Sequence, residues 1–279
     1  MSSEANNENP GDVRDALRDV VASAREWLVD LAEEGVDDLE VPVVEPSVAF
    51  TAPVVEAPAA KPAAAEPPRR TAPERADLSL LREGPDWGAN PTLDQVRETL
   101  GDCQRCELCA RRQTIVFGSG NPDADIMFVG EGPGEQEDKQ GLPFVGRAGE
   151  LLTQMIEKGV EIPRSDVYIC NIVKCRPPGN RNPKPEEAAA CRPFLDGQIA
   201  AVKPKVIVTL GKPAASLLLG RDVAITRVRG TWQDYQGIPL MPTLHPAFIL
   251  RQYTPENRRL VWEDLKAAVS RMRELGGRS

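Results

Sequence analysis

Four short apolar runs alternate with helical patterns over the last two thirds of the chain, and this alternation limits the possible folds more than any other feature. The apolar runs, rich in β-branched residues, cover 125–131, 166–175, 205–211 and 238–245. Side chains at helical spacing cover 147–159, 185–202, 212–219 and 256–276. Strands that are apolar on both faces are typical of a parallel sheet covered by helices on both sides. We therefore predict an α/β fold, a three-layer α/β/α sandwich with a central four-stranded, mainly parallel sheet.

The first 90 residues differ from the rest in composition. Residues 41–90 contain nine prolines among many alanines, and such a segment cannot bury enough apolar surface to offset the entropy lost on ordering. Before it, residues 11–35 carry apolar side chains at helical spacing, which indicates an amphipathic helix that either stays alone or docks on a protein partner. We predict an acidic segment with this helix at 1–40, a disordered linker at 41–90 and one folded domain at 91–279.

The net charge of −8 hides a division between these two parts of the chain. Residues 1–90 have a net charge of −11 and residues 91–279 a net charge of +3. A mildly basic domain is compatible with a polyanionic partner such as nucleic acid. The chain has no long apolar run for a membrane span, and its N-terminus lacks the basic and apolar regions of a secretory signal. We predict a cytoplasmic, monomeric protein that does not cross a membrane.

Four of the six cysteines are candidates for metal ligands. Cys103 and Cys106 form a C-x2-C pair, and Cys175 and Cys191 follow at a distance. In a reducing compartment, metal ligands or buried thiols are favoured over a disulfide framework. Four thiolates suit either a tetrahedral zinc ion or an iron–sulfur cluster. A single close pair with two scattered cysteines favours the cluster, although spacing alone does not decide.

The remaining two cysteines need separate interpretations. Cys109 extends the close pair to the C-x2-C-x2-C pattern of a ferredoxin, which would leave one of the distant cysteines free. The segment after Cys109 lacks the nearby fourth cysteine and proline of that pattern. Cys170 stands within an apolar run and is most simply a small buried hydrophobic residue.

Three of the predicted strands end near polar residues, and in open α/β sheets ligands bind at such carboxyl ends. These residues are Glu131, Asn171 and His245, which is the only histidine of the chain. The glycine-rich loop that begins at Glu131 lacks the patterns that hold dinucleotides or triphosphates, and its several carboxylates would repel a phosphate. The chain also has no G-x-S-x-G or H-E-x-x-H motif to support a serine hydrolase or a zinc protease.

Asn171 and Phe144 have the chemistry to bind a flat, neutral, hydrogen-bonding ring. An asparagine amide offers a donor and an acceptor to an amide-like edge, and a phenylalanine ring can stack on the flat face. A nucleobase is a ring of this kind. Taken singly, Asn171 is equally typical of a turn, and Phe144 of a hydrophobic core.

Four motifs, taken together, resemble one known family. They are GEGPGEQED, GLPFVGRAG, YICNIVKCRPPGNRNPKPEEAAAC and HPAFILR, and they occur in this order between about Thr92 and Leu275. In this combination the chain is similar to the iron–sulfur uracil-DNA glycosylases, family 4 of that superfamily. The resemblance implies excision of uracil from DNA, which leaves an abasic site in base excision repair. It also implies a 4Fe-4S cluster on Cys103, Cys106, Cys175 and Cys191.

The resemblance also implies roles for the polar residues. Asn171 would read the uracil edge, Phe144 would stack on the ring, and His245 would face the base carbonyl that gains negative charge. Other members of the superfamily place a catalytic aspartate in the glycine loop, at a position that is Gly132 in this sequence. Without that aspartate, the candidates to orient water or stabilise a cationic sugar are Glu131 and Glu137.

Basic side chains around two of these motifs are candidates for phosphate contacts, although ordinary solvated charges are equally expected for about half of them. They are Lys174, Arg176, Arg181, Lys184 and Arg251. An alternative function is a non-catalytic iron–sulfur protein that binds nucleic acid or transfers electrons. A redox protein needs no uracil pocket, so the coincidence of the base-binding residues argues for the glycosylase.

Overall fold

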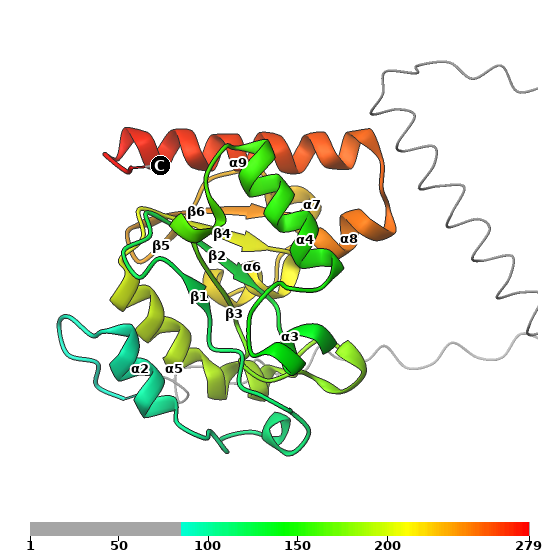
Figure 1. Cartoon of the computed structure of the whole chain (residues 1–279). Coiled ribbons are helices and arrows are strands. Elements are labelled where there is room, and N and C mark those ends of the chain that lie inside the picture. The colour runs from blue at the N-terminus through cyan, green and yellow to red at the C-terminus, as the bar shows by residue number, and fades with distance from the viewer. Residues whose placement is uncertain (1–84, 279) are drawn as a thin grey trace, which may run out of the picture. The chain divides into compact units, whose positions relative to one another are not determined.

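The computed structural model describes residues 85–278, and the predicted segments at 1–40 and 41–90 lie outside this range, apart from the last residues of the linker. The described chain forms one six-stranded sheet with helices on both faces (Figure 1). This arrangement confirms the predicted α/β class and its three layers. No helix in the described range is both long and apolar enough to cross a bilayer.

Four parallel strands form the centre of the sheet, as predicted, and two short antiparallel strands extend its edges. The strand order is β1-β3-β2-β4-β6-β5. The edge strands contain only two and three residues, too few to produce a periodic pattern in the sequence, which is why the prediction stopped at four. The bounds are β1 Ser119–Gly120, β2 Ile126–Gly130, β3 Tyr168–Asn171, β4 Val206–Leu210, β5 Gln233–Tyr235 and β6 Ile238–Thr243.

Eight helices surround the sheet in the described chain, and the predicted helical patterns correspond to the longer ones. They are α2 Leu93–Leu100, α3 Glu135–Gln140, α4 Arg147–Gln154, α5 Pro185–Val202, α6 Lys212–Leu219, α7 Ile225–Val228, α8 Pro246–Arg251 and α9 Pro255–Glu274. A π-helical turn at Met155–Gly159 continues α4. Short 3-10 helices lie at Glu107–Ala110, Arg164–Asp166 and Pro178–Asn180.

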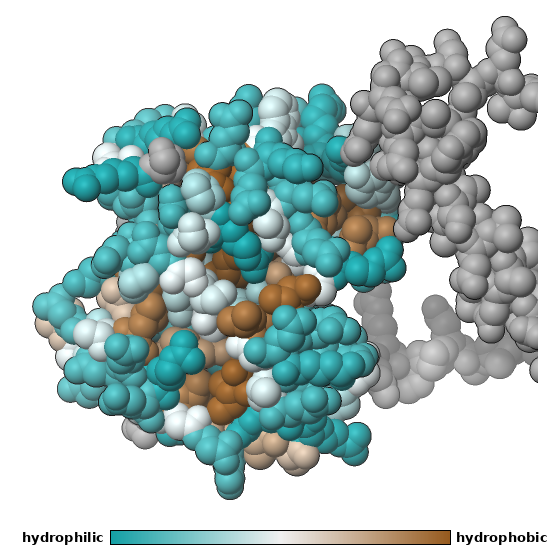
Figure 2. Space-filling model, in the orientation of Figure 1, coloured by the Kyte–Doolittle hydropathy of each residue, from teal (hydrophilic) through white to brown (hydrophobic). Residues whose placement is uncertain are grey.

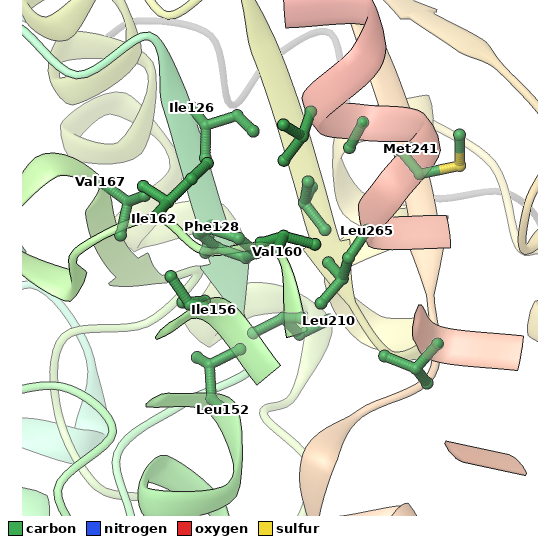
Figure 3. Close-up of a cluster of buried hydrophobic side chains, with 14 of the residues drawn as sticks. Ile126, Phe128, Leu152, Ile156, Val160, Ile162, Val167, Leu210, Met241 and Leu265 are labelled. Carbon is green, nitrogen blue, oxygen red and sulfur yellow. The ribbon is translucent and has the colours of Figure 1, made fainter. Parts of the chain in front are cut away.

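The two faces of the sheet bury separate apolar clusters, because alternate side chains of each strand point to opposite sides. On one face, Ile126 and Phe128 of β2 pack with Leu152 of α4 and Leu265 of α9 (Figure 3). On the other face, neighbouring residues of β2 pack against α5 and α6. Figure 1 shows α4, α8 and α9 on one side of the sheet and α2 and α5 on the other. Over α9 the outer surface is largely hydrophilic (Figure 2).

A buried polar cluster fixes α9 to the sheet. Asp264 of α9 is almost fully buried and forms an ion pair with Arg229, which follows α7. The Thr243 hydroxyl at the end of β6 donates to the same carboxylate at 2.6 Å. Burial raises the pKa of Asp264, while Thr243 and Arg229 oppose that shift. The ion pair therefore offsets the desolvation of a carboxylate in the interior.

We predict that Arg229→Met destabilises the protein, because it leaves the Asp264 carboxylate buried without its cation. The free energy of unfolding is expected to fall by about 3 kcal/mol. This value is at the low end of the range for a broken buried ion pair, because the carboxylate can take up a proton. For a domain of this size, that corresponds to a thermal midpoint lowered by about 6–12 °C. The matched control is Arg259→Met, whose ion pair with Glu263 is exposed and should contribute about 0–1 kcal/mol. Equal shifts for the two variants would contradict this assignment.

Candidate functional site

The carboxyl ends of β2 and β3 bring Asn171 and Phe144 together. In the parallel pairing of these strands, Gly130 lies opposite Asn171. A Cβ atom on Gly130 would lie 2.5 Å from Cζ of Phe144 and would also overlap Oδ1 of Asn171. The Phe144 ring lies 5.7 Å from the His245 ring, centroid to centroid, with 31° between their planes. Three residues predicted from the sequence to bind one flat ring are therefore neighbours in the fold.

Asn171 has an unsatisfied acceptor. Its side chain is 1% exposed, and within residues 85–278 its Oδ1 atom has no hydrogen-bond partner. Leaving a buried acceptor unpaired costs about 1–3 kcal/mol. Such an atom at a strand end, beside an aromatic ring, indicates a ligand that supplies the missing N–H or O–H donor.

The loop that carries Phe144 is held rigidly by the chain around it. Phe144 has a left-handed backbone with φ of 53°, a conformation that is strained for a bulky residue. The Arg164 guanidinium donates from Nη2 to the carbonyl oxygens of Pro143 and Phe144, both at 2.9 Å. It also donates from Nη1 to Oγ1 of Thr153 at 2.7 Å. Gly149 lets the helix approach so closely that any Cβ there would overlap the Phe144 carbonyl.

Glu137 secures the same loop from the other side. Its carboxylate accepts backbone N–H groups from Gly134 at 3.1 Å and from Val145 and Gly146 at 2.9 Å each. With three amides bound, this carboxylate connects the glycine loop to the Phe144 loop. From the sequence, Glu137 was predicted to be a candidate catalytic group. In the fold its carboxylate is bound by loop amides, so its contacts are those of a residue that positions the loops.

Glu131 has different surroundings. It follows the last residue of β2, is half-buried, and its carboxylate makes no hydrogen bond within the described chain. Burial raises the pKa of Glu131, and the nearby Arg251 guanidinium opposes that shift. Of the two candidate carboxylates, Glu131 is therefore the one that remains available to a substrate.

His245 is held as a neutral hydrogen-bond donor. It caps the N-terminus of α8, where its Nδ1 atom accepts the backbone N–H of Ala247 at 3.1 Å. An accepting Nδ1 places the ring proton of the neutral form on Nε2. Burial lowers the pKa of His245 to about 4, Arg251 lowers it as well, and Glu137 opposes them. At neutral pH the ring therefore presents an Nε2–H group.

Gly132 lets the glycine loop approach the segment that follows β3 closely. A Cβ atom there would lie 2.9 Å from Cγ2 of Val173 and 3.5 Å from Cδ of Pro177. A side chain at this position would therefore require Val173 to shift, and Gly132 itself offers only backbone atoms to the site.

Lys174, a predicted phosphate contact, requires a correction. Its side chain is 1% exposed, and Nζ donates to the Asn171 carbonyl oxygen at 2.7 Å and to Oε1 of Gln198 at 2.5 Å. A buried ammonium that is hydrogen-bonded in this way does not reach a phosphate outside the protein. A lysine within a basic, proline-rich motif looked solvated in the sequence, and only the fold shows it turned inward.

The other four basic residues differ in the hydrogen bonds and ion pairs that they already form within the protein. Arg181 forms a two-pronged ion pair with Glu187, at 2.8 and 2.6 Å, which anchors the loop to the start of α5. Arg176 donates to Oδ1 of Asn180 at 2.8 Å. Lys184 forms an exposed pair with a surface glutamate. Arg251 is exposed and has no hydrogen bond or ion pair within the described residues.

The four cysteines predicted as ligands line a single small cavity, whereas Cys109 and Cys170 do not. The segment after α2 supplies Cys103 and Cys106, the end of the β3 region supplies Cys175, and α5 supplies Cys191. All six cysteines are free thiols. Burial raises the pKa of Cys175 to about 11, so a metal would have to displace the proton from this thiol.

The surroundings of these thiols favour an anionic group. Arg105 donates to Sγ of Cys103 at 3.4 Å, and Arg112 donates to Sγ of Cys175 at 3.5 Å. Within residues 85–278, no three histidine, cysteine or acidic side chains converge closely enough to hold one metal ion. A single zinc ion needs thiolates about 2.3 Å from its centre, whereas a multi-iron cluster is larger and takes thiolates that stand farther apart. The four thiols and the two arginines that face them can accommodate an anionic metal–thiolate centre.

Sequence reasoning missed the residues that hold the site in place. Arg112, Arg164 and Gln198 each bind atoms far away in the sequence, as in the 3.5 Å contact from Arg112 to Cys175. Such long-range partners leave no local pattern. One signal was present for Arg164, which is the only arginine between the GLPFVGRAG motif and β3, but its hydrogen-bond partners could not be predicted from the sequence.

Fold and site together define an α/β protein with polar side chains and an aromatic ring at the strand ends and a four-thiol centre. A family model described as Uracil DNA glycosylase superfamily matches residues 117–266, more than half of the chain. A Type-4 uracil-DNA glycosylase of Thermotoga maritima is 50% identical over 187 residues, covering 66% of this chain and 96% of the relative.

Two further relatives carry the same description. The Type-4 uracil-DNA glycosylases of Sulfurisphaera tokodaii and Saccharolobus solfataricus are 46% and 44% identical. These matches cover 63% and 62% of this chain and 82% and 83% of the relatives. The chain therefore belongs to the uracil DNA glycosylase superfamily and, within it, to the type-4 proteins.

We predict that the His245 ring in the folded protein does not titrate near its ordinary pKa of 6.5 but only at about 4. Because the unfolded chain binds the proton more readily, this residue's contribution to stability is complete above pH 6.5 and is lost as pH falls towards 4. As the only histidine, it gives unambiguous ring signals in an NMR titration. The urea-unfolded protein is the control, and a midpoint near 6.5 in the folded state would contradict the neutral donor.

Proposed function

We propose that this protein is a monofunctional uracil-DNA glycosylase, which hydrolyses the N-glycosidic bond of uracil in DNA and leaves an abasic site. The observation that carries the proposal is the unpaired Oδ1 of buried Asn171, next to the Phe144 ring and a neutral His245. A protein that only transfers electrons does not need an unpaired buried acceptor, because it binds no hydrogen-bonding substrate. The membership in the type-4 proteins supports the same conclusion.

Uracil satisfies the groups of this site. Its ring N–H can donate to the unpaired Oδ1 of Asn171, and the amide group of Asn171 can donate to the adjacent carbonyl. The Phe144 ring stacks on the face of the base. Stacked in a duplex, the base cannot reach these groups, so the nucleotide flips out at a cost of a few kcal/mol, which is lowest for a mispaired base. Uracil opposite guanine should therefore be excised readily.

Bond cleavage makes the base an anion and the sugar a cation, and the site stabilises both. The Nε2–H group of His245 donates to the carbonyl oxygen that gains negative charge. Such a hydrogen bond, when it strengthens in the transition state, contributes about 3–4 kcal/mol. Glu131, which is free of internal hydrogen bonds, stabilises the cationic sugar or orients the attacking water. Glu137 acts through the loops that it holds.

DNA phosphates are bound by the basic residues that remain accessible. Arg251 is the strongest candidate, since it is exposed, unpaired within the described residues and close enough to Glu131 and His245 to influence both. Arg176 and Lys184 add charge around the loop after β3. Arg181 contributes mainly through its ion pair with Glu187. Such contacts position the duplex without reading its sequence.

Cys103, Cys106, Cys175 and Cys191 hold a 4Fe-4S cluster in this proposal. The cavity that all four line, together with the two arginines that face their sulfur atoms, supports this ligand set. When bound, the cluster supplies a covalent connection between the segment after α2, the loop after β3 and α5. A thiolate-bound cluster and a DNA substrate are consistent with a reducing cytoplasm. A monomeric state and a partner for the N-terminal helix stay predictions.

The direct test of the function is excision on a labelled oligonucleotide with one uracil, opposite guanine, opposite adenine or in a single strand. Cleavage that depends on uracil and appears only after alkali treatment is the expected result for a monofunctional enzyme. Oligonucleotides with thymine or cytosine at the same position are the controls. An intact, iron-loaded sample without such cleavage would reject the proposal in favour of a binding protein.

We predict that Asn171→Ala lowers the single-turnover excision rate by about 10²–10³, because it removes hydrogen bonds that strengthen in the transition state. The visible absorption of the iron-loaded protein should not change. Asn90→Ala, whose exposed side chain accepts a hydrogen bond from Lys203 just before β4, is the matched control and should keep the normal rate. Normal excision by Asn171→Ala would refute the role assigned to this residue.

We predict that Cys175→Ser abolishes stoichiometric iron binding, whereas Cys170→Ser and Cys109→Ser retain it. Of these three cysteines, only Cys175 lines the four-thiol cavity. Iron content and visible absorption after anaerobic preparation are the measurements. The buried Cys170→Ser variant controls for loss of packing. Iron loss in Cys109→Ser with full retention in Cys175→Ser would overturn the ligand set, and colourless protein with stoichiometric zinc would overturn the cluster.

A further inference from the structure

Lys174 is a buried cation without an anionic partner among the described residues. Its ammonium donates to two neutral oxygen atoms, the Asn171 carbonyl at 2.7 Å and Oε1 of Gln198 at 2.5 Å. It also contacts the neutral thiol of Cys170. No carboxylate within residues 85–278 forms an ion pair with it. A buried charge without a counter-charge is costly, so this lysine indicates negative charge that arrives with a bound group.

The same residue adjoins the four-thiol cavity. Lys174 is one of the residues that line the cavity, and its backbone N–H donates to the thiol of Cys191. The next residue in the chain is Cys175. An iron–sulfur cluster with four thiolate ligands is anionic, and its net charge and hydrogen bonds affect its potential. The cluster proposed above thus supplies the missing counter-charge.

Gln198 connects this lysine to the rest of the interior. Its Nε2 donates to the Phe117 carbonyl oxygen at 2.9 Å and to the Tyr168 hydroxyl at 3.1 Å. Tyr168 begins β3, the strand that ends at Asn171, and Gln198 lies on α5, the helix that carries Cys191. Strand and helix are thereby connected through a single buried hydrogen-bond network with Lys174 at its centre.

On the basis of the proposed function and cluster, we propose that Lys174 is a positioning residue that links the iron–sulfur cluster to base recognition. Its ammonium balances the charge of the cluster and holds the main-chain carbonyl of Asn171. The Asn171 amide, whose Oδ1 is unpaired, is thereby held towards the base. The cluster then contributes to excision through this link as well as through the fold.

The test compares Lys174→Met with the iron-loaded full-length wild type. We expect the variant to keep its visible absorption, to have a more negative reduction potential, and to excise uracil about 10–100-fold more slowly. The potential falls because, without the nearby cation, adding an electron to the cluster becomes less favourable. Lys174→Gln, which is neutral but retains a donor for the Asn171 carbonyl, should show the same shift in potential with a smaller loss of rate.

A double-mutant cycle separates positioning from a general effect on the fold. If Lys174 acts through Asn171, adding Lys174→Met to Asn171→Ala lowers the excision rate little further. The shift in reduction potential should persist in both backgrounds. Arg229→Met is the stability control, since it weakens the fold away from Lys174 and Asn171, and its reduction potential should equal that of the wild type.

Other results of these experiments would reject either the positioning role of Lys174 or the proposed function. Independent, multiplicative rate losses in the cycle, or an unchanged reduction potential in Lys174→Met, would overturn the proposed link. If neither neutral variant yields folded, iron-loaded protein while Arg229→Met does, Lys174 serves the fold alone, and the positioning role is rejected. A wild type that does not excise uracil would instead reject the function on which this inference rests.

Discussion

The parallel register of β2 and β3 is the constraint on which the rest of the site depends. It places Gly130 opposite Asn171, and because Gly130 has no side chain, the Phe144 ring and the Asn171 amide share the space above it. A different register would turn Asn171 to another face or move it away from the ring. The apolar clusters on both faces stabilise this register, so the packing of the core sets the geometry of the site.

The loops at the strand ends are rigid because charged side chains bind their backbone. Arg164 binds two carbonyl oxygens of the Phe144 loop, and Glu137 binds three amides across both loops. These contacts offset the strained left-handed backbone of Phe144. The site is therefore organised without a ligand, and little binding energy is lost in ordering its loops.

The four-thiol centre and the base-binding residues belong to one structural unit. Lys174 lies between them, with its backbone on Cys191 and its ammonium on the Asn171 carbonyl. A lysine on the surface could bind a DNA phosphate, whereas the buried Lys174 binds groups inside the protein. In the proposed arrangement, a cluster with no part in the chemical step can still affect catalysis, because it contributes the charge that this buried cation requires.

The α/β class, the four central strands and the polar groups at their ends could be predicted from the amino-acid sequence, because hydropathy and periodicity are local properties. The four cysteines that line one cavity and the group of Phe144, Asn171 and His245 were also predicted in this way. The role of each charged side chain became clear only from the fold. The fold turned Lys174 inward, separated the available Glu131 from the loop-binding Glu137, and added edge strands too short for any pattern. Such choices depend on partners far away in the sequence, which local patterns do not record.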